Sequence, residues 1–177
     1  EPQRAIDILK RIIDLAPMNL PAREMMIEQL VVMRKYEQAI QQYLNLASVY
    51  YSRAELDLAR RTYTEALRIT QQQGVDPAWK VKILHQMADI DMQSLDWRQA
   101  LKIFEQIRIL DPKDKKARAN LISLSFRLGQ PAVAIQEIDN YLSYLLQQGK
   151  LEQALPLMEE VSAEYPENLA VRQRLAE

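Results

Sequence analysis

A histidine and an aspartate four residues apart are the side chains whose types and spacing best suit chemistry. His85 is the only histidine of the chain, and Asp89 follows it on the same face of a helix. Such a pair can serve as a general base and the group that orients it. No candidate nucleophile accompanies the pair in the neighbouring sequence. We therefore predict no catalytic residues and a chain that is not an enzyme.

Carboxylates gather at three places that a metal ion might use. The runs 89–91 and 159–160 each hold two acids, and Glu24 and Glu28 are four residues apart. None of the three has the glycine turn and closing glutamate of a calcium-binding loop. The Glu24 and Glu28 pair also lacks a histidine or a third carboxylate. We interpret all three as solvated helix charges, and we predict neither a metal site nor a cofactor.

The one basic cluster is Lys113, Lys115 and Lys116. It surrounds Asp111 and Asp114, so its charge largely cancels, and the chain as a whole carries a formal net charge of -1. A protein that reads nucleic acid is expected to present a basic face. We therefore predict no nucleic-acid partner.

Composition favours a soluble, all-helical chain. Charged residues make up 27% of the 177 residues, only 3 are glycine, and none is cysteine. No stretch is apolar for the roughly 18 residues that a membrane span requires, and the N-terminus lacks a signal-peptide pattern. Because the chain opens at Glu1 without a methionine, we expect it to be a fragment of a longer protein, and we predict a cytoplasmic location.

Small residues mark where the expected helices approach one another. An alanine at a helix crossing lets two backbones come close while larger side chains fill the space on either side. Each such alanine in the first half has a counterpart 95 residues later. The pairs are Ala5 with Ala100, Ala39 with Ala134, and Ala59 with Ala154.

Other residues match at the same offset. Pro17 falls on Pro112, and Asn45 falls on Asn140. Even the irregular spacing of the alanines is copied, which shared helical periodicity alone does not explain. We infer two copies of a block of about 95 residues, one in 1–95 and a truncated one in 96–177.

The segment 40–70 shows the repeating unit most clearly. One face of each of two successive helical patterns is formed by Tyr43, Leu46, Ala47 and Tyr50, and then by Ala59, Tyr63 and Ala66. This order resembles the tetratricopeptide repeat, a helix hairpin of about 34 residues written W-x2-L-G-x2-Y followed by Ala, an aromatic residue and Pro. Gln71 stands where that family places its closing proline.

The resemblance implies an α-solenoid of antiparallel helix hairpins, a superhelix of about ten helices. We expect the segment 36–52 to serve two overlapping units, as the second helix of one and the first helix of the next. The predicted helices are 1–15, 19–33, 36–52, 55–72, 80–94, 97–110, 116–128, 131–148, 151–164 and 168–177.

The same resemblance implies a ligand-binding groove along the first helices of the units. Certain positions of these helices commonly meet the ligand in the family. Here they are Glu24, Glu28, Val31, Leu44, Ser48, Tyr51, Lys82, His85, Asp89, Met92, Ser123, Phe126, Arg127, Asp139 and Leu146. The apolar members suit an extended or helical peptide. The alternative is that these residues contact neighbouring helices instead.

By resemblance, the predicted function is a protein–protein interaction scaffold that holds a partner peptide or subunit in this groove. Self-association through uncapped ends is a second kind of partnership. The alternative function is a regulatory small-molecule-binding module of a larger signalling or transcription-control protein. A closed pocket around His85 and Asp89 would favour that alternative.

Overall fold

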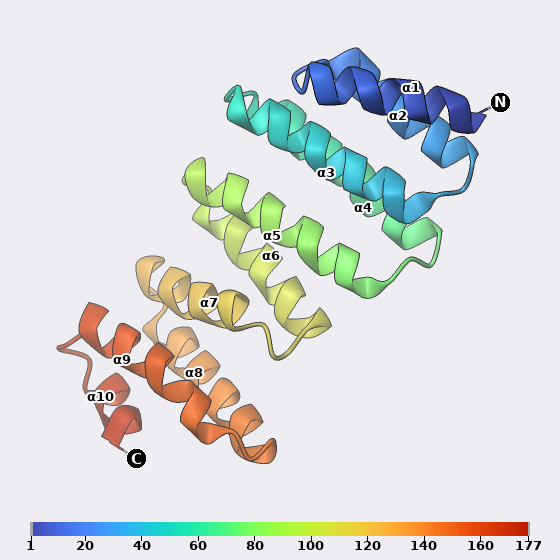
Figure 1. Ribbon diagram of the computed structural model, residues 1–177. Helices are drawn as coiled ribbons and strands as arrows, with labels where there is room; N and C mark the ends of the chain where they lie inside the picture. The colour runs from blue at the N-terminus through green and yellow to red at the C-terminus, as the bar shows by residue number, and fades with distance from the viewer. Residues whose placement is uncertain (1, 177) are drawn as a thin grey trace. The chain divides into compact units, whose positions relative to one another are not determined.

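The computed structural model describes residues 2–176 and contains only helices there (Figure 1). The elements are α1 (Pro2–Leu15), α2 (Leu20–Val32), α3 (Tyr36–Ser52), α4 (Leu56–Gln72), α5 (Pro77–Gln93), α6 (Trp97–Leu110), α7 (Lys115–Arg127), α8 (Pro131–Gln147), a 3-10 helix (Leu151–Ala154), α9 (Leu155–Glu164) and α10 (Leu169–Ala176). The prediction of an all-α fold of helix hairpins is confirmed. Glu1 and Glu177, where two predicted helices begin and end, lie outside the described residues.

The chain divides into two compact units, Glu1–Ser94 and Leu95–Glu177. Unit 1 contains α1 to α5, and unit 2 contains α6 to α10. Within each unit the helices pack on their neighbours in sequence, as α1 on α2 and α3 on α4 in unit 1, or α7 on α8 and α9 on α10 in unit 2. The inference that the two blocks are copies stays a prediction.

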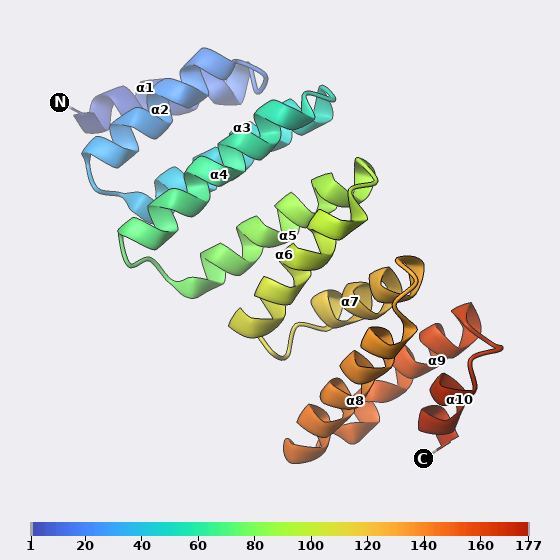
Figure 2. The same ribbon diagram turned by 180° about the vertical axis from the view of Figure 1, so that it is seen from behind.

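Each unit consists of two layers of helices (Figures 1 and 2). In unit 1, α1, α3 and α5 form one layer, and α2 and α4 form the other. In unit 2, α7 and α9 form one layer, and α6, α8 and α10 form the other. Because consecutive helices alternate between layers, α2 and α3 cannot both belong to the inner row of a groove. The double role of the segment 36–52, as the second helix of one unit and the first helix of the next, stays a prediction.

The helix bounds of the two units coincide at the offset of 95 residues. Helices α1, α2 and α3 begin and end at positions that match those of α6, α7 and α8. Equivalent side chains cap them, since Asn19 Oδ1 accepts a hydrogen bond from the Ala22 amide at 3.0 Å and Asp114 Oδ1 from the Ala117 amide at 2.8 Å. Such caps satisfy backbone donors that a helix start leaves without partners.

The alanines of the sequence pattern lie in the cores of the two units. Ala39, Ala59, Ala100 and Ala134 are each 0% exposed. In unit 2, Ala134 belongs to the same cluster as residues of α7, α8 and α9, and in unit 1 Ala39 joins a cluster with residues of α1 and α2. Larger apolar side chains around them complete the buried surface, which is the main stabilising contribution.

Two predicted helix boundaries were wrong, both at prolines. Helix α5 begins at Pro77 rather than at residue 80, because a proline fits the first turn and Asp76 Oδ1 accepts a hydrogen bond from the Ala78 amide at 2.8 Å. The predicted helix 151–164 is split into the 3-10 helix and α9. Pro156 lies in the first turn of α9, where its missing N–H prevents a continuous α-helix.

Left-handed residues end several helices. The amide of Lys35 bonds the carbonyl of Leu30 at 2.9 Å, and the amide of Gln130 bonds that of Ser125 at 2.8 Å, so both turns have the same closing bond. The left-handed residue directly precedes the amide donor of this bond. It is Arg34 in unit 1, with φ 57°, and Gly129 in unit 2, with φ 71°. A side chain makes this conformation unfavourable, whereas glycine adopts it freely.

Among residues 2–176, no helix combines the length and apolar character needed to cross a lipid bilayer.

We predict that Ala134→Leu lowers the free energy of unfolding by about 1–3 kcal/mol, because added volume in a filled core forces side chains out of their preferred conformations. The matched control is Ala132→Leu, which adds the same atoms at an exposed position of α8 and should change stability by less than about 0.5 kcal/mol. Urea unfolding followed by circular dichroism measures both. Equal losses in the two variants would contradict the close packing at Ala134.

We predict that Arg34→Gly raises the free energy of unfolding by up to about 1 kcal/mol. Glycine removes the strain of a left-handed backbone that carries a side chain, and this gain exceeds the loss of stability from the added entropy of the unfolded chain. Arg53→Gly is the control, because Arg53 ends α3 at φ -91° and glycine gains nothing there. Parallel urea titrations compare the two. A stabilisation of equal size by Arg53→Gly would argue against this explanation.

Candidate functional site

The residues predicted to form one groove are divided between layers. In unit 1, Glu24, Glu28 and Val31 lie on α2, whereas the residues of α3 and α5 lie in the other layer (Figures 1 and 2). In unit 2, residues of α7 and α8 are divided in the same way. The prediction of a single strip therefore has to be replaced by smaller surfaces, each within one unit.

The first of these surfaces joins α3 and α5. Lys82 on α5 donates a hydrogen bond from Nζ to Gln41 Oε1 of α3 at 3.2 Å, and its Nζ lies 4.9 Å from the centre of the Trp79 ring. Ser48 is exposed on α3, seven residues after Gln41. Leu44 was predicted to meet the ligand, but it is 6% exposed and belongs to the core, so it is not available to a partner.

A second group surrounds the buried phenol of Tyr63 between α4 and α5. Tyr63 is 2% exposed, and its Oη donates to Gln86 Oε1 at 3.3 Å. Burial, then the charge of Asp89 and the proximity of Tyr51, raise the pKa of Tyr63 to about 12. The predicted residues Tyr51 and Asp89 thus both act on the Tyr63 phenol, which stays neutral at physiological pH.

His85 and Asp89 are both partly buried on α5, as is Met92 one turn further on. Both members of the pair take part in interactions, so neither is free. The five pockets described for this structure are lined by other residues. Within residues 2–176 there is also no cluster of three or more acidic or histidine side chains with the geometry of a metal site.

The acidic residues of α2 face the tyrosines of α3. Tyr50 Oη donates a hydrogen bond to Glu24 Oε1 at 3.2 Å. Burial first, and then the neighbouring carboxylates of Glu65 and Glu28, raise the pKa of Tyr43. Val31, the third predicted residue of α2, packs partly against the core of unit 1. These contacts join α2 to α3, as the alternative of neighbouring-helix contacts expects.

In unit 2, the predicted residues of α7 also contact other helices. The rings of Phe126 and Tyr165 are stacked, with their centroids 4.2 Å apart, and Ser123 hydrogen bonds to the same tyrosine. The guanidinium carbon of Arg127 lies 4.8 Å from the centre of the Trp97 ring on α6. Phe126 therefore has a packing role, which reduces the surface that it can offer to a partner.

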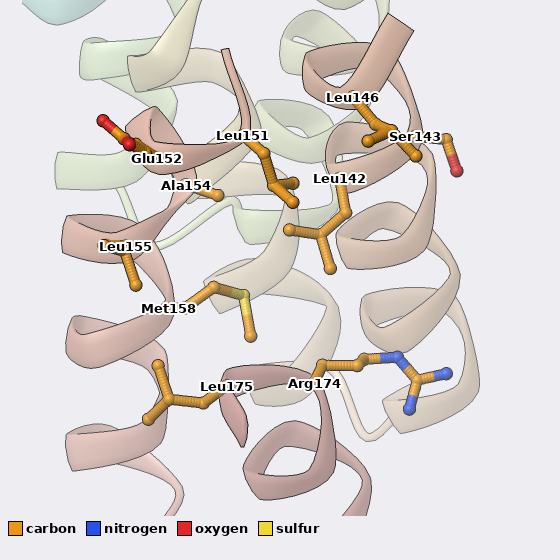
Figure 3. Close-up of a pocket in the computed structure, with 10 residues that line it drawn as sticks. All are labelled: Leu142, Ser143, Leu146, Leu151, Glu152, Ala154, Leu155, Met158, Arg174 and Leu175. Atoms are coloured by element: carbon orange, nitrogen blue, oxygen red, sulfur yellow. The ribbon is translucent and has the colours of Figure 1, made fainter. Parts of the chain in front are cut away.

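Leu146 borders an apolar pocket between α8, the 3-10 helix, α9 and α10. Figure 3 shows Leu142 of α8 directed toward Leu151 and Met158 on the opposite wall, while Glu152 points away. The cavity has a volume of about 410 Å³. We call it the leucine groove, and its walls are Leu142, Ser143, Leu146, Leu151, Glu152, Ala154, Leu155, Met158, Arg174 and Leu175.

An ion pair fixes α10 at one side of the leucine groove. Arg174 Nη2 donates to Asp139 Oδ2 of α8 at 2.8 Å, and Arg174 Nε donates to the other carboxylate oxygen. The hydrogen bond from Arg174 lowers the pKa of Asp139, with burial acting in the opposite direction and the charge of Arg174 adding to the decrease. The predicted site residue Asp139 thus positions α10.

Most of the leucine groove escaped the sequence analysis. Leu151 and Leu155 have the spacing of core residues, yet they are 44% and 51% exposed. The one signal in the sequence is Pro156, which breaks the predicted helix, so that Leu151 and Leu155 depart from its buried face.

Comparison with known proteins identifies the repeats. Family models described as "Tetratricopeptide repeat" match residues 42–76, 85–143 and 145–177, which together form more than half of the chain. No curated protein sequence matches.

Several solved structures have a similar fold. A variant of nearly identical TPR-like repeats from Podosopora anserina matches with 14% identity and a TM-score of 0.58 over 97% of this chain and 87% of that one. BtubC from P. vanneervenii matches with 15% identity and a TM-score of 0.54 over 97% and 84%. MamA matches with 12% identity and a TM-score of 0.51 over 82% and 89%. At these identities the likeness concerns the fold alone.

We predict that the phenol of Tyr63 ionises at about pH 12 and that Tyr63→Phe removes this step from a titration of tyrosinate absorbance. The folded-state pKa lies above the ordinary tyrosine pKa of 10.0, so the neutral phenol stabilises the fold fully below pH 10 and this contribution is lost as pH rises toward 12. The free energy of unfolding of the Tyr63→Phe variant should not show this loss between pH 10 and pH 12. Loss of a step near pH 10 instead would show that Tyr63 is solvated.

Proposed function

Because the chain belongs to the tetratricopeptide repeat family, we propose that it is a protein–protein interaction scaffold whose leucine groove binds the apolar face of a partner polypeptide. Repeats of this family are in general scaffolds without catalysis. No chemical step is proposed for the groove. The proposal concerns which surface of unit 2 receives the partner and what that partner presents.

The observation that carries the proposal is the exposure of three leucines around one cavity. Leu146 is 65% exposed, Leu155 is 51% exposed and Leu151 is 44% exposed, and all three line the leucine groove. Apolar side chains that gather on a surface, rather than lie singly, are typical of binding sites. Burying each leucine stabilises a complex by roughly 1.5–3 kcal/mol before the costs of association are subtracted.

The shape of the groove favours a helical partner segment. One wall is helix α8 and the opposite wall is the 3-10 helix with α9, so the hollow is elongated along helices rather than along a strand edge (Figure 3). An amphipathic helix places apolar side chains at positions i, i+3 or i+4, and i+7 into such a hollow. Ser143, Glu152 and Arg174 supply polar groups at the rim, as binding sites commonly do.

Photo-crosslinking from within the groove tests the proposal. A photoreactive amino acid replaces Leu146 in the full chain, and the control variant carries it at Ile109, which is 72% exposed on α6 of the same unit. We expect position 146 to capture a polypeptide that position 109 does not. Capture of the same proteins from both positions would contradict a specific groove. An adduct with the mass of a small molecule would favour the regulatory module instead.

The captured segment then allows an affinity measurement. We predict that Leu146→Asp weakens binding of the corresponding synthetic peptide at least tenfold, because a carboxylate in the groove removes one apolar contact and is desolvated by the partner. Ile109→Asp adds the same charge outside the groove and should leave the affinity within about twofold. Unchanged binding to the Leu146→Asp variant would refute the proposal.

A further inference from the structure

Two equivalent arginines of the two units are buried in the same way. Arg23 follows the α1–α2 turn and Arg118 follows the α6–α7 turn, 95 residues later, and they are 8% and 5% exposed. In each, Nε donates a hydrogen bond to the carbonyl of the equivalent proline, to Pro17 O at 2.8 Å and to Pro112 O at 3.2 Å. The backbone of both turns therefore holds a guanidinium in the interior.

In unit 2 the buried charge is neutralised by a carboxylate of the same chain. Arg118 Nη1 donates to Glu137 Oε1 at 2.6 Å, and Arg108 Nη1 donates to Glu137 Oε2 at 2.5 Å. The Arg118 guanidinium also lies 5.4 Å from the ring centre of Tyr141 and 5.9 Å from that of Tyr144. Glu137 is 4% exposed, so the charge is balanced within the core, as burial requires.

In unit 1 every one of these partners is replaced. Gln42 stands at the position of Glu137, Ile13 at that of Arg108, and Leu46 and Val49 at those of the two tyrosines. Arg23 forms its one hydrogen bond to Pro17, and no ion pair joins it to any residue of 2–176. Burial lowers the pKa of Arg23, because its guanidinium is removed from water and no ion pair compensates for that removal.

Arg23 opens instead onto a pocket between α1, α2 and α3. The pocket has a volume of about 370 Å³, and it is lined by Gln42 and Asn45 of α3 and by Lys10 and Asp14 of α1. Asn45 Oδ1 already accepts a hydrogen bond from Gln41 at 3.0 Å, which leaves its amide N–H groups to donate. Lys10 and Arg23 outweigh the charge of Asp14, so the pocket is positive and rich in donors.

We propose that this pocket binds a carboxylate group, which forms with Arg23 the ion pair that Glu137 forms with Arg118 in unit 2. A carboxylate matches the planar fork of a guanidinium and accepts two parallel hydrogen bonds. Gln42 and Asn45 supply further amide donors, and Lys10 adds positive charge at the exposed mouth. The site lies in unit 1, so it is independent of the leucine groove and of the function proposed for that groove.

The carboxylate could belong to two kinds of ligand, and the contacts of the pocket do not distinguish between them. One is an acidic side chain or C-terminus of a partner polypeptide, and the other is a small free carboxylate. Acetate and succinate, together with a blocked peptide of consecutive glutamates, serve as probes at constant ionic strength. Inorganic phosphate tests the chemical class of the ligand.

The decisive variant is Gln42→Glu in the full chain, because it restores in unit 1 the carboxylate that unit 2 has. We expect a higher urea midpoint for this variant and the loss of all carboxylate binding. Gln38→Glu is the matched control, since it adds the same charge at an exposed position of α3 outside the pocket. That control should bind carboxylates as the unchanged chain does and should show no rise in midpoint.

Binding is measured by nuclear magnetic resonance of the arginine Nε–H groups, with the signal of Arg23 assigned by its loss in Arg23→Lys. We expect saturable shifts of this signal with acetate or succinate. A glutamate peptide that binds at least tenfold more tightly assigns the site to a polypeptide, and equal affinity assigns it to a free acid. The proposal is overturned if no carboxylate shifts the signal, if phosphate binds more tightly, or if Gln42→Glu neither stabilises the chain nor blocks binding.

Discussion

Close approach of neighbouring helices is the constraint on which both units depend. Each helix buries its apolar face against the helices next to it in sequence, and no central core compensates for a poor contact. The fully buried alanines Ala39, Ala59, Ala100 and Ala134 allow this approach, and the side chains around them determine how the helices are rotated. Which residues face solvent follows from that rotation.

The fold could be predicted because its signals are local. The alanine spacing and helical periodicity located the α-helices of residues 2–176, since a small residue at a crossing is visible without knowledge of its neighbour. The start of α5 and the 3-10 helix were missed at Pro77 and Pro156, because a proline is compatible with both a break and a first turn.

The candidate site was harder to predict because exposure depends on neighbouring helices. Glu24 and Phe126 occupy positions that meet ligands in related repeats, yet here they contact Tyr50 and Tyr165. Conversely, Leu155 has the sequence pattern of a core leucine and is exposed. Leu146, which the sequence predicts to meet a ligand, is exposed and lines the leucine groove, and its role in binding stays a prediction.

The two units differ in their buried ion pairs, although the bounds of their equivalent helices match. Unit 2 encloses Glu137 between Arg108 and Arg118, whereas unit 1 pairs Arg60 with Asp91 between α4 and α5 and leaves Asp91 Oδ2 without a hydrogen bond. Such pairs contribute little net stability compared with apolar packing, but they disfavour alternative registers in which a charge is left alone. Among the differences between the units, glutamine in place of glutamate at position 42 removes from unit 1 the carboxylate that pairs with the equivalent arginine in unit 2.

The ion pair between Arg174 and Asp139 links the position of α10 to the shape of the leucine groove. Arg174 lies on α10 and Asp139 lies on α8, so the pair joins two helices that contribute to the walls. Leu175, the residue after Arg174, forms part of the wall that this pair positions. A molecule that fits the groove only in this arrangement would therefore stabilise the ion pair, and the ion pair would in turn strengthen its binding.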